Sequence, residues 1–92
     1  MKIVYDRAKS ERNVRERGLS FERAADFDFT TALFFVDDRR DYGELRHVAL
    51  GYLEERLHVL WFVERPSAVR VISFRKANRR EVRKYAQAQA TD

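Results

Sequence analysis

The sequence predicts an α+β domain built from two N-terminal helices, a small antiparallel β-meander and a C-terminal helix. Three observations support this prediction: two helix-capping signals near the N-terminus, three β-prone runs joined by very short connections, and a capping box before the last helical stretch. With 92 residues, of which 45% are hydrophobic, the chain suits one domain over residues 1–92.

Capping residues define the two N-terminal helices. Asp6 is placed to cap a helix over residues 7–17, because its carboxylate can accept a free N–H group of the first turn. Gly18 ends that helix, since glycine readily adopts the left-handed conformation found after helices. Ser20 then caps a second, short helix over residues 21–27.

The middle of the chain has the pattern of β-strands. Short β-prone runs at 3–5 and 30–36 and a charged loop at 37–44 precede three strand-like runs. Connections of three and four residues join these runs, which favours an antiparallel meander. The predicted strands are 45–53, 57–64 and 69–74. Simple alternation in the last strand places Arg70, Ile72 and Phe74 on one face and Val69, Val71, Ser73 and Arg75 on the other.

A capping box opens the final helix. Asn78 and Glu81 can each accept a hydrogen bond from the other's backbone N–H group, which stabilises a helix start by about 1 kcal/mol. One stripe of this helix is suited to packing on the sheet, and it consists of Val82, Tyr85, Ala86 and Gln89. Most of the basic residues of the helix fall on its solvent side.

Positive charge is concentrated near the C-terminus. The net charge is +4, yet residues 75–85 alone hold six basic side chains and one acidic side chain, which gives +5 in this segment and −1 in the rest. A localised basic patch is typical of proteins that bind a polyanion, either nucleic acid or an acidic protein. The alternative is that these residues only form a solvated helix face.

Absent residue types exclude several function classes. The chain has no cysteine, which excludes disulfides, thiolate zinc sites and cysteine nucleophiles, and which suits a cytoplasmic protein. The three glycines are isolated, so there is no phosphate-binding loop, and His47 and His58 receive no role. The longest uncharged apolar run, 59–63, is far too short to span a membrane. We therefore expect no metal, no cofactor and no membrane association.

The remaining arginine, lysine, tyrosine and glutamate side chains suffice for one reaction. RNA can be cleaved by its own 2′-hydroxyl, so the protein needs neither a nucleophile nor a metal-bound water. It has to orient the attack, stabilise the negative charge of the phosphorane and move protons. Arginine suits the second task because its planar guanidinium can bind two phosphate oxygens at once. The alternative is a non-catalytic nucleic-acid-binding module that uses the same basic patch.

Three blocks of the sequence resemble the BrnT toxins, a branch of the RelE-like ribonucleases. The first block is Tyr5-Asp6, Lys9, Asn13, Arg17-Gly18-Leu19-Ser20-Phe21-Glu22, Ala24 and Phe27. The second is Asp41-Tyr42-Gly43-Glu44, Arg46 and Gly51. The third, the most specific, is Arg70-Val71-Ile72-Ser73-Phe74-Arg75-Lys76-Ala77, Arg79, Glu81 and Tyr85. Together the blocks cover about residues 4–86 in the same order.

The resemblance implies a RelE-like fold and a bacterial type II toxin that cleaves RNA without a metal, inhibits translation and arrests growth. It also implies neutralisation by BrnA, a small ribbon-helix-helix antitoxin, and binding of operator DNA through that antitoxin. One departure is Arg17, where relatives usually carry histidine before the glycine. A cation is favourable at a helix C-terminus in either case, so we interpret this position as structural.

Candidate site residues follow from the chemistry and the resemblance together. The predicted catalytic residues are Lys9, Glu44, Arg46, Arg70 and Arg75, and the predicted RNA-binding residues are Lys76, Arg79 and Arg80. Arg70 and Arg75 are expected to stabilise the phosphorane, and Lys9 and Glu44 to transfer protons. The alternatives are a solvated strand end for the arginines and a surface salt bridge for Glu44. Packing roles are predicted for Tyr42 and Tyr85, and Trp61 is predicted to lie in the core.

Overall fold

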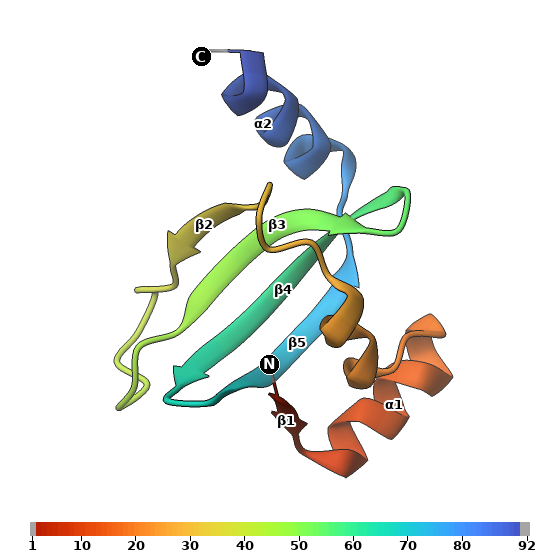
Figure 1. Ribbon diagram of the computed structural model, residues 1–92, viewed down its shortest axis with the longest axis vertical. Helices are drawn as coiled ribbons and strands as arrows, with labels where there is room; N and C mark the ends of the chain where they lie inside the picture. Colours follow the sequence, from red (N-terminus) through yellow and green to blue (C-terminus); the bar gives the residue numbers. More distant parts are fainter. Residues whose placement is uncertain (1, 91–92) are drawn as a thin grey trace.

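A computed structural model describes residues 2–90 as a five-stranded mixed sheet with helices at its margins (Figure 1). Along the chain the elements are β1 (Lys2–Tyr5), α1 (Arg7–Arg17), the 3-10 helix η1 (Phe21–Asp26), β2 (Leu33–Val36), β3 (His47–Leu53), β4 (Arg56–Arg65), β5 (Ala68–Lys76) and α2 (Arg79–Ala90). In space the strands follow the order β1-β5-β4-β3-β2. No helix within residues 2–90 is long and apolar enough to cross a membrane.

The predicted fold class, an α+β RelE-like arrangement with two N-terminal helices before an antiparallel meander, is wrong. The chain begins with β1, which pairs in parallel with β5 and places Ile3 opposite Val69, so the sheet is mixed. At the other edge β2 pairs antiparallel with β3, and the second helix is the 3-10 helix η1. Both edge strands have four residues, and so short a run carries too little pattern to reveal a partner elsewhere in the chain.

The predicted caps of the two N-terminal helices are confirmed. Asp6 accepts a hydrogen bond from the backbone N–H of Lys9 at 3.1 Å, and Gly18 adopts a left-handed conformation with φ 68° after the last turn of α1. The hydroxyl of Ser20 accepts the N–H of Glu22 at 3.2 Å at the start of η1. Local side chains therefore determine where both helices begin.

Polar contacts attach α1 to the rest of the molecule, because its buried residues are Ser10 and Asn13. The amide of Asn13 donates to the carbonyl oxygens of Leu19 and Phe74, both at 2.9 Å. Ser10 accepts the backbone N–H of Phe21 at 3.0 Å. These bonds hold α1 beside the second half of β5, where β1 no longer pairs with that strand (Figure 1).

Apolar clusters lie on both faces of the sheet. The larger cluster includes η1 and is centred on Leu60 and Phe74, which are both fully buried. The smaller cluster lies on the opposite face and consists of Leu50, Leu57, Val59, Ala77 and Tyr85. Trp61 was predicted as core, but it is only half-buried and packs against the smaller cluster.

A β-bulge interrupts the pairing of β4 with β5. Trp61 lies opposite Ser73, whereas the next residue of β4, Phe62, lies opposite Val71. Ile72 is therefore an extra residue of β5 without a partner in β4. Since side chains alternate between the faces of a sheet, one extra residue inverts the alternation for the remainder of the strand.

The bulge overturns the predicted alternation of the last strand. Phe74 lies in the same buried cluster as Val69, although simple alternation places these two residues on opposite faces. Arg70 and Arg75 consequently share one face, where the sequence pattern separated them. Nothing in the local sequence signalled the bulge, because the extra residue is an isoleucine rather than a glycine or proline.

Candidate functional site

One face of the sheet gathers the predicted arginines, and we call it the arginine face. It includes Arg46, Trp61, Val63, Arg70 and Arg75. Val63 pairs with Arg70 and Val59 pairs with Arg75, and the two valines are an even number of residues apart in β4, so all four side chains share this face. Helix α2 covers only one end of the face, since Tyr85 is its buried residue and the helix projects beyond the sheet (Figure 1).

Three arginines converge on Glu44 at the open end of the arginine face. Arg46 lies 3.6 Å and Arg65 lies 3.8 Å from the carboxylate, and Arg70 donates a hydrogen bond to it. The three come from the residue before β3, the end of β4 and the start of β5. The carboxylate is 23% exposed, so these ion pairs are less screened by solvent than pairs on an open surface. One negative charge faces three positive charges, which leaves the cluster strongly cationic.

Two donors of this cluster have no acceptor. The Nε atoms of Arg46 and Arg70 are buried and make no hydrogen bond within the described part of the chain. Arg46 Nε lies 3.6 Å from Glu44, which is too long for a hydrogen bond. A buried donor left unpaired costs about 1–3 kcal/mol, so both groups favour an additional anion with acceptor oxygens. A phosphate group meets that requirement.

The loop between β2 and β3 is organised around Asp37. Its carboxylate accepts two hydrogen bonds from the guanidinium of Arg39, both at 2.7 Å, and one from the hydroxyl of Tyr42 at 3.3 Å. The ring of Tyr42 lies 4.0 Å from the guanidinium carbon of Arg46, a cation–π contact. Asp37 thereby orients Tyr42, and Tyr42 supports an arginine of the cluster.

Hydrogen bonds from Arg39 lower the pKa of Asp37 to about 2, against an ordinary value of 3.8. The same contact raises the pKa of Arg39 above its ordinary value. The carboxylate is therefore ionised under all physiological conditions, and the loop that carries Glu44 retains this anchor.

Arg75 lies at the other end of the arginine face. Its guanidinium donates two hydrogen bonds to Glu81, both at 2.9 Å, and lies 5.1 Å from the ring of Trp61. Glu81 also accepts the backbone N–H of Asn78 at 2.8 Å, and Asn78 accepts the N–H of Glu81 at 2.9 Å, which confirms the predicted capping box. The hydrogen bond from Arg75 is the main cause of a lowered pKa at Glu81.

The other predicted residues lie apart from the Glu44 cluster. Lys9 is exposed on α1, in a shallow hollow beside Ser73 at the edge of β5. Lys76, Arg79 and Arg80 are exposed at the junction of β5 and α2. The structure therefore brings Glu44 and two arginines together, places Arg75 roughly 15 Å away along the strand, and separates the lysines from the cluster. Within residues 2–90, no three His, Asp or Glu side chains gather as metal ligands.

Arg65, Asp37 and the supporting role of Tyr42 were not predicted from the sequence. Arg65 was assigned to a turn, whereas it ends β4 on the face of Trp61 and Val63. If the predicted strand had been extended by one residue, its alternation would have placed Arg65 on the same face as Trp61 and Val63. No sequence signal was available for Asp37, because its partners depend on how the loop folds back.

An open face that gathers arginines, on a basic chain, is typical of proteins that bind a polyanion such as nucleic acid. The family model described as the ribonuclease toxin BrnT of type II toxin–antitoxin systems matches residues 5–81. The chain therefore belongs to the BrnT family, which confirms the resemblance found in the sequence. Membership makes it a ribonuclease toxin whose substrate is RNA and whose partner is an antitoxin. No curated protein matches the chain.

The pKa of Asp37 predicts an acid-sensitive contribution to stability. A carboxyl group with a lowered folded-state pKa stabilises the fold above its unfolded-state pKa of about 4, and this contribution is lost as the pH falls towards about 2. We expect Asp37→Asn to lower the free energy of unfolding at neutral pH and to flatten its pH dependence in this window. Urea unfolding at a series of pH values measures both effects. The exposed neighbour provides a control, Asp38→Asn, and equal curves for the two variants would contradict the assignment.

Proposed function

We propose that the chain cleaves RNA at the Glu44 cluster, by attack of the substrate's own 2′-hydroxyl on the adjacent phosphorus. One observation carries this proposal: three arginines surround a single carboxylate, and two of their Nε donors have no acceptor. Both Nε groups are buried, so a phosphate that enters the cluster would gain them as donors when the arginine side chains shift towards it. Family membership supplies RNA as the substrate class.

The reaction assigns a role to each group of the cluster. Glu44 takes the proton of the 2′-hydroxyl as its oxygen forms a bond to phosphorus. Arg46 and Arg70 bind the non-bridging oxygens, where negative charge increases in the phosphorane. The bond from phosphorus to the 5′-oxygen breaks, and that oxygen takes a proton from water; the hydroxide so formed takes the proton from Glu44 and restores its carboxylate. The products are a 2′,3′-cyclic phosphate and a free 5′-hydroxyl, and no step needs a metal-bound water.

Substrate binding changes the partners of Arg70. In the free protein its guanidinium is bonded to Glu44, so the acid–base group is held by a cation. When the phosphate binds, Arg70 can turn its donors to the phosphate oxygens and leave Glu44 free to accept the 2′-hydroxyl proton. Arg65, at 3.8 Å, keeps Glu44 in place during this exchange. Lys9 lies apart from these groups, so the proposal gives it no step.

Loss of the phosphorane donor should abolish most of the activity. We expect Arg70→Ala to slow RNA cleavage by about 10²–10³-fold, and Arg70→Lys to recover only part of the loss because lysine cannot bind two oxygens at once. Arg15→Ala, which removes an exposed arginine of α1, is the matched control. Cleavage is measured on purified proteins in the presence of EDTA, after each variant has been shown to fold.

The substrate itself provides the sharper test of mechanism. RNA with a single 2′-deoxy nucleotide at the cleavage position lacks the proposed nucleophile, so cleavage at that bond should cease. An undiminished rate there would exclude the 2′-hydroxyl mechanism. If the wild-type protein binds RNA but cleaves none, with or without EDTA, the result would instead support the non-catalytic binding module.

The basic start of α2 should bind the RNA backbone outside the cluster. Arg79 and Arg80 are exposed there, and residues 75–85 carry a charge of +5. Each phosphate contact to a single strand contributes about 0.7 to the slope of log affinity against log salt concentration. The double variant Arg79→Ala/Arg80→Ala should therefore flatten this slope in fluorescence anisotropy titrations. A slope equal to that of the wild type would show that neither side chain contacts RNA.

We also propose that the antitoxin is a small ribbon-helix-helix protein that covers the basic segment 75–85 and the arginine face, and through which the complex binds its operator. The concentrated positive charge supports a partner with an acidic segment. Expression of the chain alone in the cytoplasm should stop translation and growth. Co-expression of the small protein encoded beside it should restore growth, and continued arrest despite soluble partner would contradict the proposal.

A further inference from the structure

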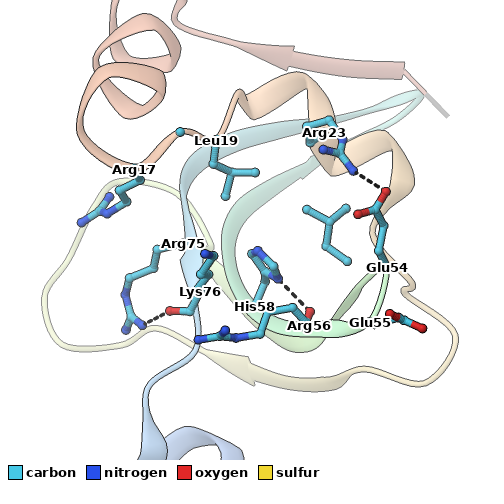
Figure 2. A pocket seen from close by; sticks show the side chains of 11 residues that line it. Arg17, Leu19, Arg23, Glu54, Glu55, Arg56, His58, Arg75 and Lys76 are labelled. Carbon is cyan, nitrogen blue, oxygen red and sulfur yellow. Dashed lines mark hydrogen bonds and ion pairs between the residues drawn. The ribbon is translucent and has the colours of Figure 1, made fainter.

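A second basic site lies outside the Glu44 cluster, at the far end of the sheet. It is a groove of about 640 Å³ between the end of α1, η1, the β3–β4 turn and the end of β5 (Figure 2). Leu19 and Leu53 give it an apolar part, and cationic side chains surround it. Of its residues, only Arg75 and Lys76 were predicted as functional from the sequence, because the rest are contributed by segments far apart in the chain.

The groove has more positive than negative charge. Its cationic residues are Arg17, Arg23, Arg56, Arg75 and Lys76, and its acidic residues are Glu54 and Glu55. Arg23 is paired with Glu54 at 3.2 Å. Within residues 2–90, no ion pair engages Arg56 or Lys76, and both side chains are exposed along the groove (Figure 2). These two cations are available to bind an anion.

His58 contributes a different kind of group to the same groove. Its Nδ1 lies 2.8 Å from the carbonyl oxygen of Arg56, and a carbonyl can only accept, so Nδ1 carries the proton. Burial lowers the pKa of His58, and the cations Arg56 and Lys76 lower it further, so the ring is neutral at neutral pH. Nε2 is then an acceptor. Figure 2 shows the ring in the middle of the lining side chains.

This combination of groups selects the chemistry of a ligand. The exposed cations require an anion, whereas Nε2 of His58 requires a hydrogen-bond donor. A carboxylate side chain provides only acceptors and would leave Nε2 unpaired. A nucleotide provides both, because its phosphate accepts from the cations and its base carries N–H groups. The volume also suits a ligand of that size.

We propose that the groove binds one nucleotide of the RNA substrate away from the cleaved bond, with its phosphate on Arg56 and Lys76 and a base N–H group donated to Nε2 of His58. The inference rests on the proposed function in taking RNA as the ligand. It adds a contact that reads the base, since only bases with a suitably placed donor can bond Nε2.

Arg75 connects the groove to the arginine face. The residue borders the groove, while its guanidinium lies on the arginine face, 5.1 Å from the ring of Trp61. An RNA strand whose scissile phosphate lies at Arg70 can follow β5 over Trp61, where a base can stack, and would then have to pass around the end of β5, because His58 and Lys76 lie on the opposite face of the sheet. The two sites are therefore joined around the end of β5 rather than along one face of the sheet.

Binding of a short 2′-O-methyl oligoribonucleotide tests the proposal, because this probe has no free 2′-hydroxyl and stays intact. We expect Arg56→Ala/Lys76→Ala to weaken binding about tenfold and to flatten the salt dependence by about 0.7 in slope, as for one lost phosphate contact. Arg7→Ala/Arg15→Ala removes the same charge from exposed positions of α1 and is the control. Equal affinities for the two double variants would overturn the proposal.

Variants of His58 test the base contact. His58→Phe keeps an aromatic ring but removes the acceptor, and should erase the preference of the protein among nucleoside 5′-monophosphates while leaving the affinity for inorganic phosphate unchanged. His58→Gln restores an acceptor and should recover part of the preference. A preference that persists in folded His58→Phe protein would overturn the base contact, and if that variant does not fold, His58→Gln and the cation pair still test the groove.

Cleavage of unmodified RNA separates the two proposals. If the wild-type protein cleaves RNA and the groove variants bind RNA as tightly as it does, the proposed function stands and the nucleotide site in the groove is excluded. If nucleotide binding depends on the groove residues but the wild-type protein cleaves no RNA, the nucleotide site stands and the proposed function is excluded. Groove variants that bind RNA normally but lose the antitoxin would assign the groove to the protein partner and overturn the nucleotide site.

Discussion

The unpaired Ile72 in β5 is the constraint on which the functional surface depends. Because the bulge inverts the alternation of the strand, Arg75 lies on the same face as Arg70, and Phe74 remains in the buried cluster. Without it, the strand would place one of the two arginines against the core. Because of the bulge, one nine-residue strand places apolar side chains in the buried cluster on one face and both arginines on the other face.

Carboxylates determine how the arginines of that face are arranged. Glu44 gathers Arg46, Arg65 and Arg70 at one end, and Glu81 holds Arg75 at the other. Like charges repel at these distances, so each glutamate stabilises an arrangement that arginines alone would not adopt. An arginine held in this way loses less conformational freedom when RNA binds, which is the physical advantage of a site organised before its substrate arrives.

Hydrogen bonds that cross between elements place the second site. Asn13 joins α1 to the carbonyl of Phe74, directly before the segment of β5 that lines the basic groove. The same residue accepts a hydrogen bond from Arg17 at 2.8 Å, and so orients a cation at the groove margin. The groove and the arginine face are consequently coupled through one strand, with α1 on its edge and α2 at its end.

The sequence by itself determined the local features of this protein and its family. The caps at Asp6 and Asn78 depend on residues within three positions of each other, and the BrnT blocks are ordered along the chain. Only the tertiary structure decided the mixed sheet, the convergence of Arg65 on Glu44 and the groove around His58. Parallel pairing of β1 with β5 and the extra residue in β5 depend on contacts between distant segments, and local periodicity carries no information about such contacts.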